Sequence, residues 1–288
     1  VLPAEGADKP LLAEAMVGRS VAPAVRTRTH EPGEVVAELR GATVPGPVRP
    51  LLDGVDLSVR RGEVVAIAGV SGNGQAALAE VMFGQRALQA GQWLLNGQPL
   101  PPRPRAVAQA GVARVPEDRH GDGAVGDLSL VDNAVLERHA EAGFARFGLR
   151  RAGAALAFAQ RLVAAFDVRG GGLGQPVRRL SGGNLQKLLL GRVLLDATPP
   201  LIVVHQPTWG LDVGAVADIH QRLLDAAAAG SAVVVISEDL DEVFAIADRI
   251  AVMHQGRLGP ARPVAEWTLA NIGLAMAGAT EGEARAAA

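Results

Sequence analysis

The sequence predicts an α/β protein with buried strands, an N-terminal region of alternating strands and a helical segment. Three observations support this fold class. Short apolar runs at residues 63–70, 201–204 and 233–236 are typical of parallel strands that helices cover on both faces. Alternating apolar and polar residues within 34–60 indicate further strands. Residues 127–179 are rich in Ala, Arg and Leu, and their helical spacing predicts helices at 131–139 and 152–166.

Composition excludes several classes of protein. The chain has 288 residues, of which 49% are hydrophobic and 20% charged, which suits one or two globular domains. It has no cysteine, so we expect neither disulfides nor a thiolate metal site. A net charge of −2 gives no bulk attraction for nucleic acid. No apolar run reaches the roughly 18 residues of a membrane span. Because the sequence begins at Val1, we expect a piece of a longer protein.

The N-terminal region predicts a tail followed by a small sheet. Residues 1–30 are weakly patterned, with a candidate amphipathic helix at 11–18, and we interpret them as a tail and linker. Residues 35–39 and 51–59 are expected strands. The Pro/Gly-rich loop at 41–50 separates them.

A glycine-rich loop follows the strand at 63–70. It reads Gly-Val-Ser-Gly-Asn-Gly-Gln-Ala-Ala over residues 69–77, and a helix with apolar Leu78 comes next. Strand, glycine loop and helix form the context of a P-loop, whose backbone N–H groups wrap phosphate oxygens. Gln75 and Ala76 stand where a P-loop carries Lys and Ser/Thr. A neutral Gln loses a charge-assisted contact of roughly 1.5–3 kcal/mol. The alternative is a glycine turn that never meets nucleotide.

A second helix start lies at residues 180–187, Leu-Ser-Gly-Gly-Asn-Leu-Gln-Lys. Ser181 occupies the expected N-cap, and two glycines leave the first turn open to a ligand. Apolar residues then recur with helical spacing at Leu185, Leu188, Leu189 and Val193. Free N–H groups and the helix dipole would attract an anion there. The alternative is an ordinary capped helix.

Two further strands lead into polar loops. The strand at 201–204 is followed by His205, Gln206 and, after a turn, Asp212. A helix is expected at 213–229, and the strand at 232–236 runs into Ser237 and Glu238.

These motifs, in this order and spacing, resemble the ATP-binding cassette (ABC) ATPases over roughly residues 35–260. The resemblance implies a P-loop NTPase core with a mostly parallel sheet, an N-terminal antiparallel β subdomain and an inserted α-helical subdomain. It assigns residues 31–280 to one ATPase domain, with the helical subdomain at about 125–180. It makes residues 1–30 the tail of a preceding cassette or a linker, with an expression remnant as the alternative. Residues 281–288 are expected to be a disordered tail.

The resemblance also implies roles for individual residues. It implies nucleotide contacts at Gly69, Ser71, Gly72, Asn73, Gly74, Gln75, Ala76 and Ala77. It implies that the signature motif comprises Ser181, Gly182, Gly183, Asn184 and Gln186. Glu117 takes the place of the Q-loop Gln, and Asp212 matches the loop that contacts an opposing cassette.

The catalytic positions implied by the resemblance carry unusual residues. His205 replaces the Walker B Asp, and imidazole is a poor ligand for Mg²⁺, which prefers oxygen. Gln206 replaces the catalytic Glu, and an amide cannot accept a proton from water. Glu238 replaces the switch His, and its carboxylate would repel phosphate. The loop at 41–50 has no aromatic residue to stack on adenine. No His spacing suggests another metal site.

The unusual residues therefore lie at the P-loop and catalytic positions, whereas the signature motif is intact. ABC cassettes pair head to tail, and each ATP lies between one P-loop and the opposite signature helix. The resemblance implies that this chain completes a partner's ATP site, while its own P-loop is degenerate. The sequence Pro-Glu-Asp-Arg at 116–119, Asn184 and the segment at 269–278 resemble the second cassette of tandem simple-sugar and nucleoside importers.

We therefore expect the nucleotide-binding domain of an importer, which couples ATP binding and hydrolysis to sugar or nucleoside uptake. The expected cofactor is ATP, with Mg²⁺ weak or absent at this chain's own site and little activity of the chain alone. The expected partners are a second cassette, in the N-terminal half of the same polypeptide, and transmembrane permease subunits, with no nucleic acid. The expected location is peripheral, on the cytoplasmic face of the plasma (inner) membrane.

Two alternatives belong to other functional classes. One is an inactive interaction module that docks on the membrane subunits and regulates them. The other is a soluble ABC protein acting on DNA or ribosomes, which the missing basic patch disfavours.

Overall fold

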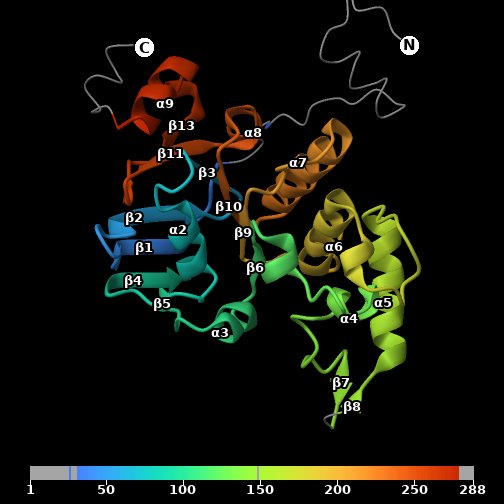
Figure 1. Ribbon diagram of the computed structural model, residues 1–288. Helices are drawn as coiled ribbons and strands as arrows, with labels where there is room; N and C mark the ends of the chain where they lie inside the picture. The colour runs from blue at the N-terminus through green and yellow to red at the C-terminus, as the bar shows by residue number, and fades with distance from the viewer. Residues whose placement is uncertain (1–25, 27–30, 148, 279–288) are drawn as a thin grey trace, which may run out of the picture.

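The computed structural model describes residues 26, 31–147 and 149–278, and Figure 1 shows their arrangement. The candidate helix at 11–18 and the tail at 281–288 lie outside the described residues. Arg26 is held against the body of the protein. Its guanidinium pairs with the Asp248 carboxylate at 2.9 Å and donates to the Gly62 carbonyl at 2.8 Å.

The central sheet has the strand order β12-β11-β3-β10-β9-β6 within the described chain, and β13 pairs with β11. Strands β11, β3, β10, β9 and β6 run parallel. This result confirms the predicted mostly parallel sheet. The strands are β3 (Val64–Ala68), β6 (Val112–Val115), β9 (Leu201–His205), β10 (Ala232–Ser237), β11 (Arg249–His254), β12 (Arg257–Leu258) and β13 (Arg262–Pro263).

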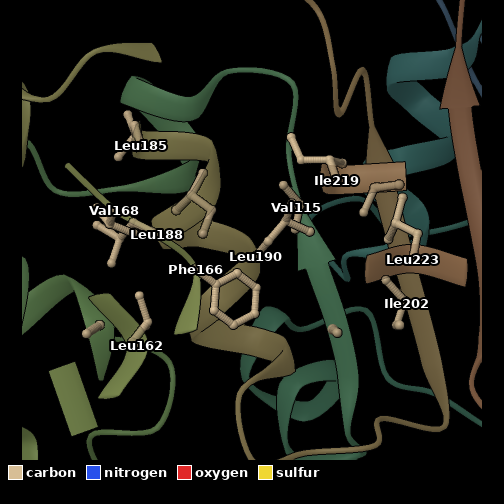
Figure 2. Packing of buried hydrophobic residues seen from close by; sticks show 14 of the residues in the cluster. Val115, Leu162, Phe166, Val168, Leu185, Leu188, Leu190, Ile202, Ile219 and Leu223 are labelled. Carbon is tan, nitrogen blue, oxygen red and sulfur yellow. The ribbon is translucent and has the colours of Figure 1, made fainter. Parts of the chain in front are cut away.

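Helices cover both faces of this sheet, which explains why every residue of β3, β9 and β10 is buried. One core cluster joins the sheet to α5 (Ala152–Ala165), α6 (Gly182–Leu194) and α7 (Val213–Ala228). Figure 2 shows residues of α6 between Ile202 of the sheet and Leu162 of α5. The other face packs against α2 (Gln75–Met82) and the second sheet.

The second sheet is the predicted antiparallel subdomain. It has the order β2-β1-β4-β5 and lies beside α2 in Figure 1. Its strands are β1 (Val35–Val44), β2 (Leu52–Arg60), β4 (Ala90–Leu95) and β5 (Gln98–Pro99). Alternate residues of β2 are buried, as the sequence pattern predicted.

The helical segment lies on the opposite side of the central sheet (Figure 1). It contains α4 (Leu130–Ala134), α5 and a small hairpin of β7 (Ala145–Arg146) and β8 (Leu149–Arg150). Helix α5 confirms the expected helix at 152–166. The expected helix at 131–139 is shorter than predicted, because the chain after Ala134 forms turns that bring Glu137 between two arginines.

The remaining elements complete the covering of the sheet. They are α3 (Pro104–Gln109), α8 (Leu240–Ile246), α9 (Leu269–Met276), a π-helical turn η1 (Arg119–Gly123) and the 3₁₀ turns η2 (Val177–Arg179) and η3 (Val264–Glu266). Among the helices of the described residues, none is long and apolar enough to cross a bilayer.

Candidate functional site

The glycine loop closes on the side chain of Gln75. Gln75 Nε2 donates to the Val70 carbonyl at 2.9 Å, and its Oε1 accepts the Asn73 N–H at 3.0 Å. The side chain is 4% exposed, and a Cβ added to Gly69 would lie 2.6 Å from Gln75 Nε2. The amide of Gln75 therefore fills the hollow of the loop and occupies one of the N–H groups that a phosphate would use.

The loop is also tied down from outside. Asn73 Oδ1 accepts the Gln255 N–H at 2.8 Å, and the Asn73 carbonyl accepts the Gly256 N–H at 2.7 Å. Gly74 has φ 119° and precedes α2 without a side-chain cap. The strained loop conformation thus depends on glycine and on contacts to the turn after β11.

A pocket of about 180 Å³ lies beside this loop. It brings together most of the residues that the sequence assigned to the chain's own site: Ser71, Gly72, Gly74, Gln75, Ala76, Ala77, Glu117, His205 and Glu238. Glu80 and Arg86 also line it and were not foreseen, although both follow the loop on or just after α2. The pocket holds three carboxyl side chains, which makes it a poor environment for a polyphosphate.

His205 is buried at the end of β9, where burial lowers the pKa of its imidazole to about 4. The carboxylates of Glu238 and Glu80 oppose this shift but do not overcome it. His205 Nε2 lies 3.5 Å from a carboxylate oxygen of Glu117. The imidazole is therefore neutral at pH 7 and offers no positive charge to an anion.

Gln206 lies outside this pocket. It is buried with φ 51°, and its N–H donates to the Ile236 carbonyl at 2.8 Å. Its Oε1 accepts the Glu238 N–H at 3.5 Å. The Gln206 side chain thus braces the loop after β10 instead of facing the pocket.

Arg119 lies between the P-loop side and the signature side. Its guanidinium donates to the Trp209 carbonyl, and Nη1 would lie 3.3 Å from a Cβ added to Gly182. Trp209 is 72% exposed and lines a pocket of about 430 Å³ together with Glu117 and Arg119. Partial burial lowers the pKa of Arg119, although a guanidinium remains charged at neutral pH.

The predicted signature motif forms the open start of α6. Ser181 is the N-cap, and its side chain accepts the Asn184 N–H, as expected from the sequence. A pocket of about 560 Å³ lies in front of it. This pocket is lined by Ser181, Gly182, Gly183, Asn184, Lys187, Asp167, Arg169, Gly210, Leu211, Asp212, Gly214 and Ala215. The structure thus brings Asp212 and the signature residues together around one hollow.

The charged rim of this pocket was not predicted. Arg169 Nε donates to Asp167 Oδ1 at 2.9 Å, and Lys187 Nζ lies 3.5 Å from Asp167 Oδ2. The hydrogen bond from Arg169, supported by the charge of Lys187, lowers the pKa of Asp167. Lys187 falls within the helix start at 180–187, whereas Arg169 lies outside every motif that the sequence indicated.

Gln186 does not line the pocket. It is fully buried, and neither of its amide atoms has a hydrogen-bond partner. Helical spacing places it on the face of Leu189 and Leu190, which points into the core. The structure therefore separates Gln186 from the other signature residues.

Among the described residues, no group of three or more His, Asp or Glu side chains could hold a metal ion. Ala76 supplies no hydroxyl at the loop, and His205 supplies nitrogen where Mg²⁺ prefers oxygen. Positions 76 and 205 therefore supply no oxygen ligand for Mg²⁺.

The sequence of this chain is similar to those of known proteins. The ABC transporter family profile matches residues 52–208. A glucose import ATP-binding protein of Haloferax volcanii is 43% identical over 96% of this chain and 51% of its own length. A guanosine import ATP-binding protein of Bacillus subtilis is 38% identical over 95% of this chain and 54% of its own length. The chain therefore spans about half the length of these curated relatives.

Solved structures share the fold. A nucleotide-free ATP-binding cassette of an ABC transporter has a TM-score of 0.65, with 20% identity, over 80% of this chain and 92% of that chain. The ATP-binding subunit of another ABC transporter has a TM-score of 0.65, with 21% identity, over 87% of this chain and 98% of that chain. At these identities the likeness concerns the fold alone.

Proposed function

This chain belongs to the ABC transporter family, and we propose that it is the nucleotide-binding domain of an importer in which its signature helix completes the ATP site of a second cassette. The observation that carries the proposal is the contrast between the two helix starts. The start of α6 opens onto a pocket of about 560 Å³, whereas the loop before α2 is filled by the side chain of Gln75.

The chain's own glycine loop is proposed to bind nucleotide weakly. Gln75 must leave the loop before a phosphate can reach the Asn73 N–H. Ala76 has no hydroxyl, neutral His205 is a poor Mg²⁺ ligand, and the carboxylate of Glu238 would face the phosphates. These four unfavourable features at one pocket support a degenerate site.

The signature pocket suits a phosphate held from the other side. Ser181, Gly182 and Gly183 lie at the positive end of the α6 dipole, where backbone N–H groups and a hydroxyl can donate to an anion. Lys187 and Arg169 add positive charge at the rim. A nucleotide carried by a second P-loop would supply the phosphate, and this chain would supply hydrogen-bond donors.

The solute is proposed to be a simple sugar or a nucleoside. The relatives named for glucose and guanosine import support this choice, and they are about twice as long as the matched region. The additional length gives room for a second cassette in the same polypeptide. We further propose transmembrane permease subunits as partners and a peripheral position at the cytoplasmic face of the membrane.

Calorimetry would test this proposal. The chain is titrated with MgATP alone and then in the presence of its partner cassette, and phosphate release is measured in parallel. The proposal predicts weak binding to the chain alone, with tight binding and hydrolysis only in the pair. Tight MgATP binding to the chain alone would contradict the degenerate loop. No binding in either case would favour an inactive interaction module.

A further inference from the structure

We infer that Asn184 is a positioning residue that turns the Ser181 hydroxyl proton outward, toward the pocket where a phosphoryl oxygen would accept it. The inference rests on the proposed function, because it assigns a task to Asn184 within the same signature pocket. Its basis is a short chain of hydrogen bonds that joins Arg169, Asn184 and Ser181.

The orientation of the Asn184 amide follows from its neighbour on one side. The backbone N–H of Arg169 points at the Asn184 side chain, with 2.5 Å between N and Oδ1. A backbone N–H can only donate, so the atom that faces it must be the amide oxygen. The Nδ2 group is therefore the one that faces Ser181 Oγ, at 2.8 Å.

The direction of the Ser181 proton then follows. An amide NH₂ can only donate, so Ser181 Oγ must accept from Asn184 Nδ2. The same oxygen accepts the Asn184 backbone N–H at 3.5 Å, as an N-cap does. With both acceptor directions of the hydroxyl used, its proton can be donated only in the remaining direction, away from Asn184. Ser181 itself is exposed on the pocket wall.

A second N-cap in the same chain shows that this arrangement is not a general result of placing Asn at the third helical position. In α9, Thr268 is the N-cap, and its Oγ1 accepts the Asn271 N–H at 3.2 Å. There the Asn271 Oδ1 accepts the Thr268 backbone N–H at 2.8 Å, which closes a capping box. Asn184 forgoes that bond, gives its oxygen to Arg169 and gives its NH₂ to the serine hydroxyl.

The contact with Arg169 also has a consequence for the pocket rim. Because Asn184 holds the Arg169 backbone, it fixes the segment that carries the ion pair of Arg169 with Asp167. Ser181 and this rim are thereby held in one arrangement before any phosphate arrives. Such preorganised donors are most effective where negative charge develops.

A double-mutant cycle on the complete transporter tests the inference. Steady-state ATP hydrolysis is measured at saturating MgATP for Ser181→Ala, Asn184→Leu and the double variant. Ser181→Ala should lower the hydrolysis rate roughly tenfold or more, because it removes a hydrogen bond to a charged group. Asn184→Leu should lower the rate about two- to tenfold, because the Ser181 proton is then no longer directed toward the pocket. If Asn184 acts through the hydroxyl, the double variant is no slower than Ser181→Ala alone.

A purely structural role would give a different result. If Asn184→Leu lowers the rate by the same factor in the Ser181→Ala background, Asn184 does not act through Ser181, and the inference is overturned. If Asn184→Leu fails to fold, the isosteric Asn184→Asp replaces it in the same cycle. The Asp side chain keeps an acceptor for the Arg169 N–H but turns a second acceptor, instead of the NH₂ donor, toward Ser181. Its added charge should change the rate by the same factor with Ser181 or with Ala at position 181. Any further slowing should appear only when Ser181 is present.

Two controls separate this inference from the proposed function. Asn271→Ala, at the matched position of α9, should leave the rate within about twofold, since its N-cap is remote from both pockets. A wild-type rate for Ser181→Ala would instead show that the signature pocket is not used, and the proposed function itself would fail.

Discussion

The glycine loop before α2 and the signature turn before α6 are built alike, yet an amide side chain does opposite things in each. At the glycine loop, Gln75 folds inward and accepts the Asn73 N–H that a phosphate would need. At the signature turn, Asn184 folds along the helix and leaves the hydroxyl of Ser181 directed outward. Glycine content alone therefore does not leave a helix start open to an anion, because the neighbouring amide decides whether the N–H and O–H donors remain free.

The largest expected effect is a loss of stability when the ion pairs that hold α6, the helix of the signature motif, are broken. Glu137 pairs with Arg192 of α6 at 3.1 Å and with Arg114 of β6 at 2.7 Å. Arg192 also donates to the Gly123 carbonyl and is 2% exposed, and burial lowers its pKa. Glu137→Ala should lower the free energy of unfolding by about 3–5 kcal/mol, because it leaves a buried guanidinium unpaired. Urea unfolding of the chain measures this change.

An exposed ion pair offers the matched control. Glu38 pairs with Arg40 at 2.7 Å on the surface of the antiparallel sheet. Glu38→Ala should change the free energy of unfolding by less than about 1 kcal/mol. Equal losses for the two variants would contradict the view that a buried network anchors α6.

The next largest effect is expected from a substitution of Gln75 that opens the glycine loop to phosphate. Gln75→Lys frees the Asn73 N–H and adds a charge, so MgATP affinity of the chain should rise by roughly 10- to 100-fold. Gln75→Ala separates the two causes, because it opens the loop without adding charge. Calorimetric titration gives both affinities. Unchanged binding by Gln75→Ala would mean that the lost charge, and not the closed loop, limits this half.

The neutral imidazole of His205, beside the glycine loop, should make the stability of the chain depend on pH. The pKa of His205 is about 4 in the folded protein, below the ordinary value near 6.5. Between these values the unfolded chain binds a proton that the folded chain does not, so stability falls as pH decreases from 6.5 toward 4. His205 alone should cost about 2 kcal/mol between pH 7 and pH 5.

His205→Leu isolates this contribution, since the carboxylates titrate in both proteins. Urea unfolding of the wild type and the variant at pH 7 and pH 5 gives the difference. The variant should lose less stability on acidification than the wild type. Parallel losses in the two proteins would mean that His205 is protonated in the folded state.

The smallest expected effect tests repulsion at the same pocket. Glu238 is exposed, so its charge is partly screened by solvent. In the Gln75→Lys background, Glu238→Gln should raise MgATP affinity by only about two- to fivefold, and the gain should shrink at high salt. Glu141→Gln, in the helical segment, serves as the control for a change in net charge. A gain that is independent of salt would point to a steric cause.

Local chemistry made much of the fold predictable. The apolar runs located β3, β9 and β10, and the spacing of Leu185, Leu188 and Leu189 located α6. Ser181 was expected as the N-cap because its side chain bonds a group only three residues away. Features that depend on sequence neighbours were therefore accessible without the structure.

Features that depend on distant contacts were not. Helix α4 is shorter than the sequence indicated, because Glu137 pairs with arginines of β6 and α6 that lie far from it in the sequence. Arg169 reaches Asn184 across a loop whose glycines gave no sign of a fixed path. Gln186 stands in the predicted signature stretch, but helical rotation turns its side chain into the core. Residue type indicated chemistry there, whereas packing decided access.

The most direct measurement places one arginine in each half. Ser181→Arg fills the signature pocket, and Ala76→Arg, at an exposed position in the first turn of α2, fills the glycine-loop pocket. Both variants are compared in the complete transporter for ATP hydrolysis at saturating MgATP. We predict that Ser181→Arg abolishes hydrolysis, whereas Ala76→Arg leaves the hydrolysis rate within about twofold of the wild type. Loss of activity in Ala76→Arg with normal activity in Ser181→Arg would contradict it.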